Sequence, residues 1–158
     1  MLTPLNRSLY AAATILVAIL ADAPFNTAQA ASARALEMRA SDPALKWGPC
    51  PPVFPAGCQI AVLHGDPSKP NADVFLRVPS RYEIPAHWHT SAERMILVTG
   101  KMTVTYQGQP ASKLTKGSYA YGPAKLAHKA ACTSKKACTL FIAFETPVDA
   151  HLFEGALD

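Results

Sequence analysis

Short segments after residue 58 alternate between apolar and polar residues, which predicts β-strands. They cover residues 59–64, 73–78, 94–99, 102–106, 118–121 and 139–144, and each is rich in β-branched or aromatic residues. Turn signals such as Gly65-Asp66-Pro67 and Gly122-Pro123 separate them. No helical pattern falls between them. The sequence therefore predicts an all-β fold, either an antiparallel sandwich or a barrel.

The first 30 residues have the pattern of an export signal. Arg7 supplies a positive charge, residues 10–21 form an apolar run, and Ala28-Gln29-Ala30 has the small-x-small pattern of a cleavage site. Asp22 and Pro24 interrupt the apolar run before it reaches the roughly 20 residues of a membrane span. Residues 1–30 are therefore predicted to be a signal peptide, with an uncleaved anchor as the alternative. After cleavage we expect no membrane span and a periplasmic or secreted protein.

Two segments precede the predicted barrel of residues 56–154. Residues 31–46 contain good helix formers with only a thin apolar stripe, which predicts a short N-terminal helix or a mobile arm. Residues 47–57 are rich in proline, and proline lacks the N–H that a helix or a central strand needs. Residues 31–55 are therefore interpreted as an arm followed by a proline-rich loop.

The four cysteines take their meaning from the predicted export, because disulfides persist in oxidising compartments. Four cysteines allow three pairings. The local pairs Cys50–Cys58 and Cys132–Cys138 are favoured, since each encloses a short loop next to strand-like sequence. A four-thiolate metal site is the alternative, but the C-x₂-C spacing of zinc ribbons is absent.

Composition and charge limit the classes of molecule that the protein could bind. The chain has 158 residues, of which 49% are hydrophobic and 16% charged, and this is the composition of one globular domain. The net charge of +4 is mild, and the basic residues are scattered. Nucleic-acid binding is therefore excluded, because it requires a clustered basic surface.

One short segment carries the groups that suggest metal chemistry. His87, His89 and Glu93 lie two and four residues apart, so on a continuous strand their side chains project to the same face. Two imidazoles and a carboxylate are common ligands of transition metals. A polar edge strand that faces water is the alternative. His64 and His151 are interpreted as surface residues.

The spacing of seven residues resembles the two sequence motifs of the cupin superfamily. The first motif is His87-x-His89-x₃-Glu93-x₆-Gly100, and the second is Gly117-x₅-Pro123-x₄-His128. The resemblance covers about residues 56–146, and the chain is most similar to small exported single-domain cupins. It departs from the pattern at Arg81, Lys125 and Cys132, where the superfamily has two glycines and an asparagine.

The resemblance implies an antiparallel double-stranded β-helix, the cupin or jelly-roll barrel. It also implies that His87, His89, Glu93 and His128 bind one divalent transition metal, which is Fe, Mn, Cu, Ni or Zn. Four protein ligands leave two octahedral positions open for a small molecule. A homodimer is a further expectation, because pairing covers exposed sheet edges.

The leading hypothesis from this resemblance is a metal-dependent enzyme that acts on a small metal-chelating organic molecule. Dioxygenase-type oxidation is the expected reaction, with Glu93 as a ligand that also serves as a base. The alternatives are isomerase, lyase or decarboxylase chemistry, a non-catalytic periplasmic module that binds or senses a metal or metabolite, and a barrel with an empty site. Tyr106, Tyr121 and Met102 are predicted to line the substrate pocket, with core packing as the alternative for each.

Overall fold

The structure is a computed structural model that describes residues 35–158. The predicted signal peptide, residues 1–30, lies outside the described residues. The part of the chain that is described contains strands and turns and no helix. It therefore has no long apolar helix that could cross a membrane. The strands are β1 (Gly48–Pro49), β2 (Gln59–His64), β3 (Ala72–Val78), β4 (Glu83–Trp88), β5 (Glu93–Thr99), β6 (Lys101–Tyr106), β7 (Ser112–Thr115), β8 (Tyr119–Gly122), β9 (His128–Cys132), β10 (Cys138–Phe144) and β11 (His151–Leu152).

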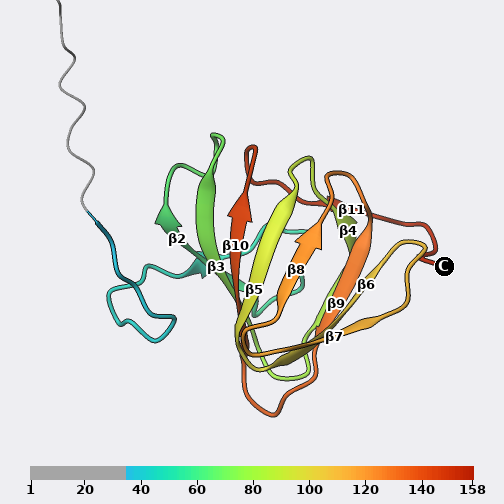
Figure 1. Cartoon of the computed structure of the whole chain (residues 1–158), viewed down its shortest axis with the longest axis horizontal. Helices are drawn as coiled ribbons and strands as arrows, with labels where there is room; N and C mark the ends of the chain where they lie inside the picture. The colour runs from blue at the N-terminus through green and yellow to red at the C-terminus, as the bar shows by residue number, and fades with distance from the viewer. Residues whose placement is uncertain (1–34) are drawn as a thin grey trace, which may run out of the picture. The chain divides into compact units, whose positions relative to one another are not determined.

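The strands form two antiparallel sheets that pack face to face (Figure 1). One sheet has the order β1-β2-β3-β10-β5-β8, and the other has the order β11-β4-β9-β6-β7. Consecutive strands repeatedly change sheet, for example from β3 to β4 and from β9 to β10. The all-β, antiparallel barrel predicted from the sequence is confirmed.

The core lies between the inner faces of the two sheets. The most deeply buried side chains include Val74, Leu97 and Met102, none of which is more than 2% exposed. They come from strands β3, β5 and β6, so both sheets contribute. Alternate residues on each strand face this space, which explains the period-two pattern in the sequence.

The strand β4 shows why part of the fold escapes prediction. Pro85 lies inside it, and the ladder between β4 and β9 is irregular between Ile84 and His87. Proline cannot donate a ladder hydrogen bond, so it is tolerated at such an interruption. This interruption of the ladder lies just before His87.

Two disulfides join the pairs that the cysteine spacing favours. Cys50–Cys58 closes the proline-rich loop, because it joins the residue after β1 to the residue before β2. Cys132–Cys138 connects the end of β9 to the start of β10 and thus links the two sheets. Residues 35–46 form turns without a helix, so of the two expectations for this segment only the arm fits its described part.

The motif glycine Gly100 occupies a turn that excludes any side chain. Its φ is +90°, and an added Cβ would lie 2.6 Å from the Cys138 sulfur. Glycine is the residue that adopts positive φ without steric penalty. A side chain at position 100 would therefore collide with the Cys132–Cys138 disulfide.

Two departures from the motif keep the left-handed backbone that glycine would accept more easily. Arg81 has a φ of +59° and Lys125 has a φ of +63°. A non-glycine residue in this region carries a penalty of about 1–2 kcal/mol, partly offset because glycine loses more entropy on folding. The turns are therefore retained although the glycines are not.

Replacing Arg81 with glycine is expected to stabilise the protein by roughly 0.5–1 kcal/mol, because the left-handed strain disappears. Arg81→Ala is the matched control, since alanine removes the same charge and keeps the Cβ. Urea denaturation monitored by tryptophan fluorescence measures both variants. Equal stabilities of the two variants would contradict the strain argument.

Candidate metal centre

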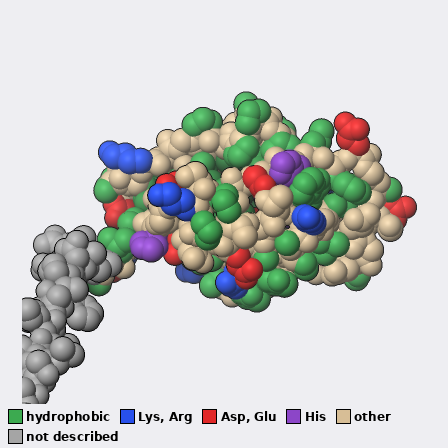
Figure 2. Space-filling view, turned by 90° about the horizontal axis from the view of Figure 1, so that it is seen from above, with side chains coloured by type: hydrophobic (Ala, Val, Ile, Leu, Met, Phe, Trp, Pro, Cys, Tyr) green, Lys and Arg blue, Asp and Glu red, His purple; other side chains and the backbone are tan. Residues whose placement is uncertain are grey.

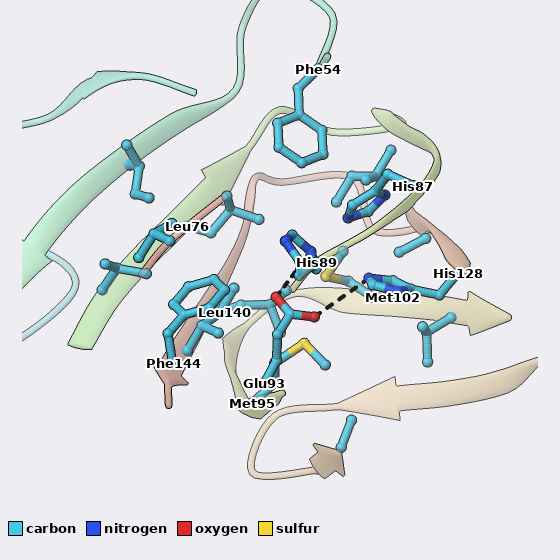
Figure 3. Close-up of a pocket in the computed structure, with 18 of the residues that line it drawn as sticks. Phe54, Leu76, His87, His89, Glu93, Met95, Met102, His128, Leu140 and Phe144 are labelled. Carbon is cyan, nitrogen blue, oxygen red and sulfur yellow. Dashed lines mark ion pairs between the residues drawn. The ribbon is translucent and has the colours of Figure 1, made fainter. Parts of the chain in front are cut away.

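Four polar side chains with metal-binding atoms converge between the sheets. His87 lies on β4 and His128 on β9, and the two residues are paired across the β4–β9 ladder. His89 follows directly after β4, and Glu93 begins β5 in the other sheet. Figure 3 shows the four side chains turned toward one another at one side of a pocket.

The sequence spacing suggested that His87, His89 and Glu93 project from one continuous strand, but in the structure they do not lie on a single strand. The chain leaves one sheet after Trp88 and enters the other at Glu93. His89 and Glu93 therefore approach the same point from opposite sheets. Trp88 points away from the site, as the alternation predicts, and stacks on the exposed ring of His151 with centroids 4.2 Å apart.

The four groups are close together and buried. One ligand atom from each of the three histidines lies within 4.8 Å of the others. Glu93 Oε1 is 3.3 Å from His89 Nε2, and Glu93 Oε2 is 3.5 Å from His128 Nε2. None of the four residues is more than 6% exposed.

Each imidazole is oriented by a hydrogen bond to a backbone carbonyl. The Nδ1–H of His87 donates to Pro85 O at 2.7 Å, and that of His128 donates to Leu126 O at 3.2 Å. His89 Nδ1 donates to the carbonyl of Asp149. These bonds fix the tautomer, so each Nε2 carries a lone pair. Three nitrogen lone pairs therefore face the centre of the cluster.

Burial keeps two of the imidazoles neutral. Desolvation, together with the nearby His128 and His89, lowers the pKa of His87 from 6.5 to about 3. Desolvation also lowers the pKa of His128, although Glu93 opposes the shift. A metal ion binds the neutral imidazole. Both histidines are thus in their ligand form at neutral pH.

The donor set fits a cation. Glu93 Oε2 is buried and has no hydrogen-bond partner, and an unsatisfied buried carboxylate oxygen is costly. Its neighbour His128 Nε2 cannot donate to it while the ring keeps its Nδ1–H tautomer. The lone pairs of Glu93 Oε2 and His128 Nε2 therefore face and repel each other. A cation bound between them would be attracted to both atoms.

Several supporting residues were not identified from the sequence. Ser91 is 1% exposed, and its Oγ accepts hydrogen bonds from the backbone N–H groups of Glu145 and Thr146. Lys125 donates its backbone N–H to His89 O at 2.8 Å. Asp149 accepts the His89 hydrogen bond through its backbone carbonyl. Every residue has such a carbonyl, so the sequence does not identify this contact. The Asp149 carboxylate accepts from Thr90 and thereby holds this segment against the site.

The pocket beside these groups has a mostly apolar wall. Met102 lines it, together with Phe54 from the proline-rich loop and Phe144 from β10 (Figure 3). The other apolar lining residues are Pro51, Ile60, Val74, Leu76, Ile84, Met95, Val104, Leu114, Ala120, Ala130, Leu140, Ile142 and Val148.

The two tyrosines predicted for the pocket lie elsewhere. Tyr121 is 50% exposed and does not line this pocket, because its position on β8 faces outward. Tyr106 is buried but does not line the pocket either; its ring packs beside His128 with centroids 5.3 Å apart. Strand alternation alone could not separate these cases, since the twist and the sheet edges decide which faces are covered.

Two antiparallel sheets around a buried cluster of histidines define a cupin. A family model described as the ChrR cupin-like domain matches residues 37–147. The chain therefore belongs to the ChrR cupin-like family, and the resemblance stated from the motifs is confirmed at the level of the superfamily. No curated protein matches the chain.

Solved structures share the fold at low sequence identity. The Schizosaccharomyces pombe Cnp3 cupin domain is 18% identical, with a TM-score of 0.52 over 56% of this chain and 61% of that chain. The DMSP lyase DddQ from Ruegeria pomeroyi DSS-3 is 18% identical, with a TM-score of 0.59 over 71% and 64%. An oxalate oxidase is 12% identical, with a TM-score of 0.54 over 66% and 59%. The chain spans about three fifths of the length of each, and these similarities establish the fold alone.

Proposed function

We propose that the protein is a metal-dependent enzyme that oxidises a small metal-chelating organic molecule with dioxygen. The observation that carries this proposal is the convergence of three imidazole Nε2 atoms and one carboxylate on a buried pocket. His87, His89, Glu93 and His128 would hold one divalent transition metal, which is Fe, Mn, Cu, Ni or Zn. Fe, Mn, Cu or Ni would supply redox chemistry to a chelating substrate, whereas Zn would supply Lewis-acid chemistry only.

The lining of the pocket supports a particular substrate class. Side chains such as Phe54, Leu140 and Phe144 offer apolar contacts and no hydrogen-bond donors. A substrate would therefore bury an apolar body against them and direct its polar head toward the histidines. Molecules with two neighbouring oxygen atoms on an apolar skeleton, such as diketones, catechols and keto acids, have this form.

The scarcity of proton-transfer groups favours oxidation over elimination or isomerisation. Apart from the four proposed ligands, Asp149 is the one titratable residue that lines the pocket in the described chain. Its carboxylate is already engaged by Thr90 and lies 3.1 Å from His151 Nε2. Glu93 is thus the remaining candidate base, and a reaction that relies on dioxygen makes the smallest demand on it. The solved structures with a similar fold include both a lyase and an oxidase, so the experiment must distinguish these two reactions.

Oxygen consumption by the metal-loaded protein tests the proposal. The protein is loaded in turn with each candidate metal and assayed in an oxygen electrode with diketones, catechols and keto acids. We expect turnover that His89→Ala reduces by at least about 100-fold, because loss of a ligand removes the metal. His64→Ala is the matched control, since His64 is exposed at the end of β2.

Other outcomes would contradict the oxidation. Product formation without oxygen consumption would assign the lyase or isomerase alternative. Tight, metal-dependent binding of a panel compound without any turnover would instead assign a non-catalytic binding or sensing role.

We also propose that the protein works outside the cytoplasm, in the periplasm or as a secreted protein. Its two disulfides are of a kind that persists in oxidising compartments, and the predicted signal peptide supports the same location. The homodimer stays a prediction.

A further inference from the structure

Tyr106 carries a buried hydroxyl with no partner. The residue lies at the end of β6, opposite His128 in the β6–β9 ladder, and is 9% exposed. Within residues 35–158, two buried side-chain oxygen or nitrogen atoms lack a hydrogen bond, namely Tyr106 Oη and Glu93 Oε2. A buried hydroxyl without a partner is costly, and its presence calls for an explanation.

The two unpartnered oxygen atoms flank the same glycine. A Cβ added to Gly122 would lie 3.2 Å from Glu93 Oε2 and 3.5 Å from Tyr106 Oη. Both oxygens therefore lie close to one small space that a side chain at position 122 would fill. Gly122 pairs with Glu93 across the β5–β8 ladder, so the space lies directly beside the carboxylate.

The chemistry of the two groups is complementary. A phenol can donate one hydrogen bond, whereas an ionised carboxylate only accepts. A phenol has a pKa of about 10 and keeps its proton at neutral pH, so the Tyr106 hydroxyl has a hydrogen bond to donate. Tyr106 packs beside His128 and is not among the residues that line the proposed substrate pocket. Its hydroxyl is therefore available to the carboxylate rather than to a substrate.

We propose that Tyr106 is a positioning residue that donates a hydrogen bond, through one buried water, to Glu93 Oε2 and holds this carboxylate in place as a metal ligand. The inference rests on the proposed metal site and adds a supporting group to it. Hydrogen bonds to ligating carboxylates fix their orientation, and their loss commonly weakens metal binding by about 10–100-fold. The small residue at position 122 is required because it leaves room for the water.

The test compares metal affinity and metal spectra rather than activity. Co²⁺ is titrated into the metal-free protein in competition with a chromophoric chelator, and the visible Co²⁺ absorption bands are recorded. We expect Tyr106→Phe to weaken binding at least about 10-fold and to shift the bands. Gly122→Ala is expected to do the same, because its methyl group would occupy the space between the two oxygens.

Tyr82→Phe is the matched control. Tyr82 is also buried, but its hydroxyl donates to Pro55 O, away from the histidines. This variant should lose stability and keep the Co²⁺ affinity and spectrum of the wild type. Thermal unfolding of each metal-free variant shows whether the fold is intact.

The failures are distinguishable. If the wild type binds Co²⁺ and Tyr106→Phe has the same affinity and the same bands, the role of Tyr106 is overturned and the metal site stands. If the wild type binds none of the candidate metals, both this role and the proposed function are overturned.

Discussion

Adding a divalent transition metal to the chelator-treated protein is expected to raise its melting temperature by about 10 °C. A ligand present at 100 times its dissociation constant stabilises the folded state by about 2.7 kcal/mol. For a domain of this size, each kcal/mol corresponds to roughly 3–5 °C. Part of this stabilisation would come from Glu93 Oε2 and His128 Nε2, because a metal ion between them would replace the repulsion of their lone pairs with attraction.

The variant His128→Ala is expected to lose this metal-dependent shift. It removes one of the inward-facing nitrogens and is measured by differential scanning fluorimetry with and without each candidate metal. His64→Ala is the matched control, because it removes an exposed histidine that lies outside the cluster. A shift that persists in His128→Ala would show that the metal binds elsewhere on the chain.

The strands that the sequence predicts best are those that cross the core. In β5 buried and exposed residues alternate because one face is packed against the opposite sheet, whereas β3 and β10 are mostly apolar strands with consecutive buried residues. The strands β7 and β9 were missed, since β7 is exposed at a sheet edge and β9 combines alanines with a lysine. At such positions the ladder, rather than the side-chain pattern, defines the strand.

The candidate site shows a similar division. The motif spacing identifies the four groups, because histidines and a carboxylate at these intervals carry the chemistry in their side chains. The supporting contacts of Asp149 and Leu126 are made by backbone carbonyls, which leave no trace in residue type. The place of Tyr106 behind His128 depends on strand pairing and on the missing side chain of Gly122.

Charged side chains are dispersed over the face of the molecule that Figure 2 shows. Figure 2 shows charged side chains scattered over one face among uncharged ones, without a continuous basic patch on that face. A mild net charge of +4 spread in this way offers little attraction to a phosphate backbone.

The metal-free protein is expected to lose about 2 kcal/mol of stability between pH 7 and pH 5 through His87 alone. An unfolded imidazole takes up a proton below pH 6.5, whereas the folded His87 stays neutral until about pH 3. Unfolding therefore binds a proton in this range, and stability falls as the pH is lowered through 6.5. Each pH unit below that value contributes about 1.4 kcal/mol. His128, whose pKa is lowered in the same direction, adds to the loss.

Replacing His87 with glutamine tests this origin of the acid sensitivity. Urea denaturation of the chelator-treated wild type and of His87→Gln is measured at intervals between pH 5 and pH 7. The variant should show a shallower decline, because its side chain cannot take up a proton on unfolding. His64→Gln should decline as steeply as the wild type, since this histidine is exposed in the folded state. Equal slopes for His87→Gln and the wild type would mean that His87 takes up its proton over the same pH range in the folded and unfolded states, which would contradict the lowered pKa of His87.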